Sequence, residues 1–142
     1  MAKIQAKKMK MTQVWKNDRV IAVSPLKLKA PEETEAFKEG DLIKVSGLTK
    51  GHGFQGVVKR YSFAGGPKTH GQKNRYRAPG SIGATATQRV IPGRKMAGRM
   101  GGVQKTIRNL KVVTVDKAQA LLMVRGSVPG NTNSKVTIVK SS

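Results

Sequence analysis

The feature that most constrains this chain is a long central stretch without any carboxylate side chain. Between Asp41 and Asp116 there is no acidic residue, yet this stretch holds 15 of the chain's 28 lysines and arginines. The whole chain has 142 residues, about one domain's worth, and a formal net charge of +21. A compact domain with so much unpaired positive charge would repel itself, so we expect a polyanionic partner, with nucleic acid the leading candidate.

Glycine content separates this central stretch from the two ends of the chain. Residues 51–102 hold 12 of the 16 glycines, both histidines and no long apolar run. A segment with few large apolar side chains cannot offset an ordering entropy of roughly 1–2 kcal/mol per residue. We therefore expect residues 51–102 to form an extended basic arm that is mobile alone and becomes ordered against its partner. The arm is inserted in a discontinuous domain made of residues 1–50 and 103–142.

Short runs of β-branched residues bounded by turn formers predict that this domain is built from strands. Trp15, the sole tryptophan, is expected to pack on a strand face, and a proline followed by three glutamates predicts one or two helical turns over residues 31–38. The sequence thus predicts a mainly β fold, a small β-barrel with a long irregular basic central extension. The expected strands are residues 11–15 and 19–24, joined as a hairpin around Lys16-Asn17-Asp18, and residues 41–46, 55–60, 106–110, 111–116, 120–125 and 135–140.

Several classes of protein are excluded by what the sequence lacks. There is no cysteine, which rules out a disulfide scaffold, a thiolate metal site and a cysteine nucleophile. No apolar run approaches about 18 residues, so we expect no membrane partner. The basic start of the chain lacks the apolar stretch of a signal peptide, so we expect a cytoplasmic protein.

The glycines at 51–56 match the pattern G-x-G-x-x-G of nucleotide-binding loops. A dinucleotide fold needs a helix after the glycines and an acidic residue about 20 positions further on, and a kinase needs carboxylates for magnesium. The residues that follow, 57–60, read as a strand, and residues 42–115 contain no acid. We therefore expect no nucleotide cofactor here, although backbone N–H groups of such a loop can hold phosphates of RNA.

The side chains that could carry chemistry also favour RNA over catalysis. His52 and His70 have no carboxylate or metal partner nearby in the sequence, so we expect no enzyme, no metal, no cofactor and no small-molecule substrate. The aromatic residues of the arm lie among lysines and arginines, as base stacking requires, but the pattern fits local packing of the arm equally well. These candidate stacking residues are Phe54, Tyr61, Phe63 and Tyr76.

The cations and histidines of the arm and its two edges form the predicted RNA-binding set. Their spacing among glycines suits phosphate contacts from side chains and main chain together. The set consists of Lys50, His52, Lys59, Arg60, Lys68, His70, Lys73, Arg75, Arg77, Arg89, Arg94, Lys95, Arg99, Lys105 and Arg108.

Several segments, taken in order, resemble the universal large-subunit ribosomal protein L-three family. Residues 47–60, G-L-T-K-G-H-G-F-Q-G-V-V-K-R, resemble one family signature, and residues 93–101, G-R-K-M-A-G-R-M-G, resemble the block G-K-K-M-x-G-x-M-G. Shorter similar segments are residues 7–12, 63–67, 69–71, 77–83, 109–113 and 128–130. The resemblance covers most of residues 6–140, and the ordered set is far more specific than any single block.

This resemblance implies a translation-protein-type β-barrel bound to 23S-type ribosomal RNA in the cytoplasmic ribosome. It also implies that the arm reaches toward the peptidyl transferase centre, that the protein acts early in subunit assembly, and that the proteins L-fourteen and L-nineteen are neighbours. A free-standing basic RNA chaperone, acting through charge alone, is the alternative from another class.

Two departures from the family pattern matter. Bacterial members carry a longer segment before the block at 47–60, where this chain has only residues 30–40, so its barrel could be incomplete, reduced in strand number, or completed by RNA or a neighbour. Some members carry a methylated glutamine, but Gln88 aligns with it only ambiguously, and that modification is not transferred to this chain.

Overall fold

The computed structural model describes residues 3–141, which divide into two compact units. The barrel unit consists of the residues up to Lys50 together with those from Gly102 onward. The arm unit is Gly51–Gly101.

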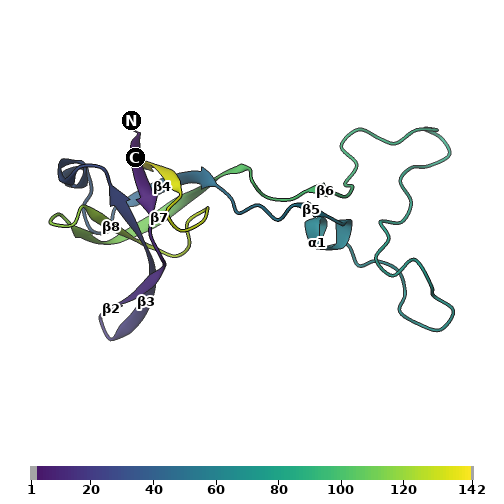
Figure 1. Cartoon of the computed structure of the whole chain (residues 1–142), viewed down its shortest axis with the longest axis horizontal. Coiled ribbons are helices and arrows are strands. Elements are labelled where there is room, and N and C mark those ends of the chain that lie inside the picture. The colour runs from purple at the N-terminus through teal and green to yellow at the C-terminus, as the bar shows by residue number, and fades with distance from the viewer. Residues whose placement is uncertain (1–2, 142) are drawn as a thin grey trace. The chain divides into compact units, whose positions relative to one another are not determined.

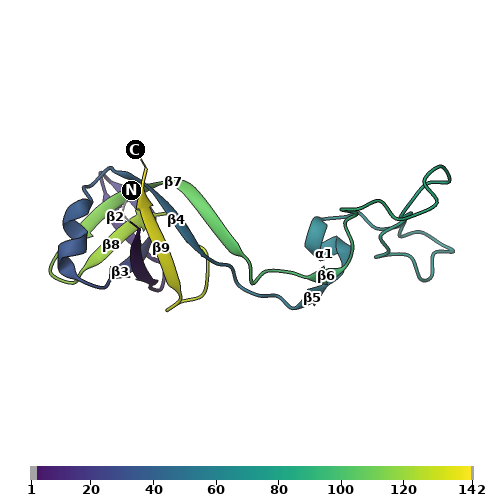
Figure 2. The ribbon, with the colours of Figure 1, turned by 90° about the horizontal axis from the view of Figure 1, so that it is seen from above.

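The barrel unit is a closed antiparallel β-barrel, which confirms the predicted fold class (Figures 1 and 2). Six strands follow one another around it in the order β1, β9, β4, β7, β8 and β3, and β1 also pairs with β3, which closes the ring. The strands are β1 (Ile4–Lys8), β2 (Thr12–Lys16), β3 (Arg19–Leu28), β4 (Leu42–Leu48), β7 (Gln104–Asp116), β8 (Leu121–Arg125) and β9 (Lys135–Lys140). The ring is therefore closed by strands of this chain.

The closing strand β1 was not predicted from the sequence. Ile4 lies opposite Ile138 of β9, and Ala6 is buried between Leu28 of β3 and Val136 of β9. Only two apolar side chains alternate with polar ones along this strand, which is too short a pattern to stand out. Its pairing with strands from both ends of the chain is what completes the barrel.

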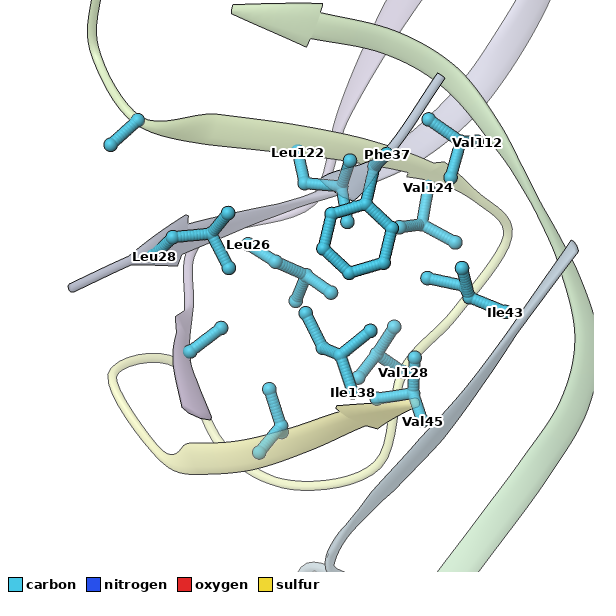
Figure 3. Packing of buried hydrophobic residues seen from close by; sticks show 13 residues of the cluster. Leu26, Leu28, Phe37, Ile43, Val45, Val112, Leu122, Val124, Val128 and Ile138 are labelled. Atoms are coloured by element: carbon cyan, nitrogen blue, oxygen red, sulfur yellow. The ribbon is translucent and has the colours of Figure 1, made fainter. Parts of the chain in front are cut away.

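The core of the barrel comes from the inward-facing side chains of the strands (Figure 3). Leu26, Ile43, Leu122 and Ile138 are fully buried. The phenyl ring of Phe37 lies among these aliphatic side chains (Figure 3), immediately after the short 3-10 helix η1 (Pro31–Ala36), which forms within the predicted helical segment. Burial of each such side chain contributes about 1.5–3 kcal/mol, so this core stabilises the closed ring.

A single bent strand replaces the two strands predicted at 106–110 and 111–116. Leu110 of β7 pairs with Ile43 of β4, and Ile107 of β7 pairs with Val45 of β4. Between these two pairs β7 therefore has one more residue than β4, which is a β-bulge. Asn109, between Ile107 and Leu110, has a φ of 58°, the left-handed conformation that one type of bulge uses. The bulge bends β7 without ending it. A pattern of strand propensity cannot distinguish such a bend from a break between two strands.

The predicted hairpin at the N-terminal end is confirmed, but the prediction for Trp15 is wrong. β2 and β3 are joined by Asn17 and Asp18, both in the left-handed conformation of a two-residue hairpin turn. Trp15 pairs with Val20, and its side chain is 71% exposed. The first buried residue of β3 is Val23, so the turn end of the hairpin lies beyond the barrel core.

The arm unit has little regular structure among its described residues. β5 (Phe54–Gln55) pairs with β6 (Gly98–Arg99), and α1 (Val57–Tyr61) follows β5 (Figure 1). The predicted strand at 55–60 is therefore wrong. The N–H of Arg60 donates to the carbonyl oxygen of Gly56, and the resulting turn buries Val57, so local burial overrides the strand propensity of two adjacent valines.

Candidate nucleic-acid interface

The base of the arm unit is held by backbone pairing between its two ends. His52 N–H donates to the carbonyl oxygen of Met100 at 2.9 Å, and Met100 N–H donates to that of Gly53 at 2.9 Å. Gln55 Nε2 donates to the carbonyl oxygen of His52 at 2.6 Å. These bonds place the exposed His52 side chain beside the β5–β6 pair.

One cluster in the arm unit brings four of the predicted residues together around the ring of Tyr61. The Arg60 guanidinium lies 4.9 Å from the ring centroid and the Lys95 amine lies 5.6 Å from it, distances at which a cation is attracted to the ring face. The centroid of the Phe63 ring lies 6.3 Å from the centroid of the Tyr61 ring, and the two rings are tilted relative to each other. The aromatic residues at 61 and 63 thus pack within the arm unit, which is one of the two alternatives that the sequence left open.

Arg60 also forms a hydrogen bond to the backbone of the segment that carries Lys95. Its Nη1 donates to the carbonyl oxygen of Met96 at 2.8 Å. A Cβ added at Gly98 would lie 2.7 Å from the same Nη1 atom, so the guanidinium would have to shift. Glycine at 98 therefore gives the guanidinium the space to cross to residue 96.

The other two predicted aromatic residues remain accessible. The Phe54 side chain is 77% exposed, and that of Tyr76 is 39% exposed. The Tyr76 hydroxyl donates to the carbonyl oxygen of Gln72 at 2.6 Å, which orients the ring but leaves part of it open. These two rings have the accessibility that base stacking needs.

Two glycines let the loop bearing Arg75 and Arg77 fold back on the chain. Gly66 N–H donates to the carbonyl oxygen of Tyr76 at 3.1 Å. Gly65 has a φ of 78°, and a Cβ there would overlap the Tyr76 carbonyl oxygen. Beside these glycines lies a hollow of about 610 Å³, bordered by Phe63, Arg75 and other residues of the segment 63–80.

The charges of the predicted RNA-binding set have no carboxylate partner. Among residues 3–141 the ion pairs are Lys16–Glu39 at 2.7 Å, Lys117–Glu35 at 3.7 Å and Lys140–Asp41 at 2.6 Å. None involves a member of the set. Arg60 is half-buried and every other member is exposed. The arm unit holds 12 of the 15 members, and Lys50, Lys105 and Arg108 belong to the barrel unit.

The histidines and the glycine motif show no sign of a catalytic arrangement. Both His52 and His70 are exposed. Within the described range, no group of three or more histidine, aspartate or glutamate side chains could hold a metal ion. The glycines at 51–56 are followed by a helix and not by the predicted strand, but α1 has only five residues, and the acid that a dinucleotide site needs is still absent.

These observations define a small, strongly basic β-barrel protein with a glycine-rich cationic segment inserted between the neighbouring strands β4 and β7. The family described as "Ribosomal protein L3" matches residues 15–121. The chain belongs to this ribosomal protein L3 family, which confirms the resemblance found in the sequence.

Several relatives are named "Large ribosomal subunit protein uL3". The protein of Dehalococcoides mccartyi is 55% identical over 106 residues, 74% of this chain and 52% of that protein. That of Chloroherpeton thalassium is 57% identical over 106 residues, 74% of this chain and 51% of that protein. That of Chlorobaculum tepidum is 49% identical over 123 residues, 86% of this chain and 59% of that protein. The chain thus spans about half the length of the curated relatives it matches.

In the part of the chain that the structure describes, no helix is long and apolar enough to cross a membrane.

Proposed function

We propose that this protein is a structural constituent of the large ribosomal subunit and binds its 23S-type ribosomal RNA in the cytoplasm. The observation that carries the proposal is the predicted RNA-binding set, whose cations have no carboxylate partner in the described chain. The names of the relatives and the family membership support the same role. This role is structural and requires no catalytic residue, metal or cofactor.

The arm is the main RNA-binding part in this proposal. We propose that it reaches toward the peptidyl transferase centre, that the protein joins the subunit early in assembly, and that L-fourteen and L-nineteen are its neighbours. Most members of the set are exposed lysine and arginine side chains, which suit phosphates. Phe54 and Tyr76 are the accessible rings on which unpaired bases can stack.

Salt dependence tests the electrostatic part of the proposal. If the arm neutralises about 8 phosphates, the log–log slope of affinity against salt is roughly −7 for duplex-like sites. Replacing Lys68 and Lys73 with glutamine should make the slope less steep by about 1.5–2. Replacing Lys38 and Lys117, which lie beside carboxylates, removes the same charge and is the matched control. A wild-type slope near zero would contradict the proposal.

Co-sedimentation tests the assignment to the subunit. The protein should migrate with large subunits at moderate salt and protect defined segments of their RNA. Equal affinity for unrelated RNA, together with absence from ribosomal particles, would instead support the free-standing RNA chaperone.

A further inference from the structure

A row of lysines crosses three neighbouring strands on the outside of the barrel. Lys7 of β1 is paired in register with Lys27 of β3 on one side and with Lys135 of β9 on the other. All three side chains are exposed. Lys29, just past the end of β3, is also exposed and borders the same hollow as these three lysines. None of these lysines belongs to the predicted RNA-binding set.

This arrangement is unfavourable for the barrel by itself. Cβ atoms of directly opposed residues on antiparallel strands lie about 4.5–5.5 Å apart, and like charges at such positions destabilise the sheet. Strand alternation requires only that these outward-facing positions be polar, and an uncharged polar side chain would satisfy that requirement. A negatively charged partner would offset the repulsion within this row.

No carboxylate in the described chain neutralises the row. Glu35, Glu39 and Asp41 form ion pairs with lysines elsewhere on the barrel unit. Glu33 lies near one end, where its Oε2 accepts the backbone N–H of Lys29 at 3.2 Å. The amines of Lys7, Lys27 and Lys135 make no ion pair among residues 3–141.

The row also borders a depression with further hydrogen-bond donors. The hollow has a volume of about 470 Å³, and the side chains of Gln5 and Asn133 lie at its border beside the lysines. Amide groups donate to phosphate and ribose oxygens. None of the exposed large hydrophobic residues among residues 3–141 borders the hollow, and Leu28, which does border it, is buried, so the lysine amines are the charged groups that a partner meets here.

We propose that Lys7, Lys27, Lys29 and Lys135 form a second RNA-backbone site, carried by the barrel unit. Adjacent strands are about 4.7–4.9 Å apart, so the three lysines in register span about 10 Å. At a rise of about 3.4 Å per nucleotide along one strand of a duplex, this span corresponds to about three nucleotide steps. The inference rests on the proposed function, and its contacts fix the barrel on the RNA without reading sequence.

The first test compares two triple variants of the full chain in binding to large-subunit ribosomal RNA over a range of salt concentrations. Lys7→Gln/Lys27→Gln/Lys135→Gln removes the row, and Lys16→Gln/Lys38→Gln/Lys117→Gln removes the same charge beside carboxylates. Loss of three phosphate contacts should make the slope less steep by about 2–3, with little change in the control. Circular dichroism establishes that both variants fold.

The outcomes separate this inference from the proposed function. If the wild type binds with a steep slope and the row variant keeps that slope, the lysine row is not an RNA site, while the proposed function stands. If the wild type itself shows no salt-dependent binding, the proposed function fails as well.

The second test locates the partner directly. Because the chain has no cysteine, a single Gln5→Cys substitution can carry a tethered iron chelate beside the row without competing attachment sites. In reconstituted large subunits, hydroxyl radicals from this position should cleave a discrete segment of ribosomal RNA, one that the same probe at Gln13→Cys does not cleave. Cleavage of a neighbouring protein without cleavage of RNA, or no cleavage at all, would overturn the proposal.

Discussion

The side-chain amine of Lys8 donates a 2.7 Å hydrogen bond to the carbonyl oxygen of Gly130. The same amine donates another, also of 2.7 Å, to the carbonyl oxygen of Val128. Both acceptors are buried residues of the loop between β8 and β9. One lysine of β1 therefore fastens the connection that leads the chain into β9. Burial lowers the pKa of the Lys8 amine, and the nearby positive charge of Lys50 lowers it further.

Replacing Lys8 with methionine should destabilise the barrel. Methionine keeps most of the apolar length of the side chain but leaves two carbonyl oxygens without their donor, which costs about 1–3 kcal/mol. Urea denaturation followed by circular dichroism measures the loss. The exposed Lys10 provides the control, since Lys10→Met should change the free energy of unfolding by less than about 0.5 kcal/mol. Equal effects of the two variants would contradict a specific role for Lys8.

Asp41 makes the barrel sensitive to acid. Its carboxylate accepts a hydrogen bond from Lys140, at 2.6 Å, and another from the Lys38 backbone N–H, and these bonds lower its pKa below the ordinary value of 3.8. The stability that it contributes is therefore complete above about pH 4 and is lost as pH falls through its pKa in the folded protein.

The variant Asp41→Asn should lack that part of the acid dependence. Measured between pH 5 and pH 2, its free energy of unfolding should fall less steeply than that of the wild type, because asparagine cannot be protonated in this range. Glu32→Gln, at an exposed carboxylate on η1, should keep the wild-type slope. A parallel decline in all three proteins would show that Asp41 is not responsible.

Gly65 is the glycine of the arm unit at which a side chain should do most harm. Its positive φ and the Tyr76 carbonyl oxygen facing it both exclude a Cβ atom. Gly65→Ala should open the turn that presents Arg75 and Arg77, which lowers RNA affinity and speeds amide exchange over residues 63–80 in the RNA-bound protein. The melting temperature of the barrel unit should be unchanged.

Gly56 supplies the matched control for this substitution. It has no atom within 4 Å of an added Cβ and an ordinary extended conformation. Gly56→Ala should therefore leave amide exchange in residues 63–80 as in the wild type. If both variants behave alike, the close approach of Gly65 to Tyr76 has no structural importance in solution.

The sequence predicted what depends on local pattern. The alternating residues of β9 lie where they were expected, at Lys135–Lys140, and β8 begins one residue later than expected, at Leu121. In both strands buried and less buried side chains alternate, so the signal and its physical cause coincide. The stretch without carboxylates likewise predicted where cations without an acidic partner would lie, because the positions of acidic and basic residues can be read directly from the sequence.

What the sequence could not predict depends on contacts between distant residues. The lysine row exists only because β1 pairs with β3 and β9 in one particular register, and a shift of one residue would disperse it. In the same way, no local pattern shows that Arg60 donates to the carbonyl oxygen of Met96, or that Arg94 donates to that of Ser81. Both bonds support the fold of the arm unit itself.

Trp15 offers a direct check of the wrong prediction. As the sole tryptophan, 71% exposed, it should give red-shifted fluorescence that acrylamide quenches readily in the folded protein. Trp15→Ala should cost less than about 0.5 kcal/mol, because little apolar area is lost. Blue-shifted emission that resists quenching would instead place the indole in a core.

The repulsion within the lysine row should be measurable in the free protein. Lys7→Gln removes a positive charge that is paired with Lys27 and with Lys135, so at low salt it should stabilise the barrel by about 0.5 kcal/mol. The gain should vanish near 1 M salt, where the screening length falls to about 3 Å. Lys117→Gln removes an attraction to Glu35 and should give no such gain. Thermal melting of the three proteins at low and high salt decides the matter, since a gain in Lys7→Gln that persists in high salt would have a cause other than charge.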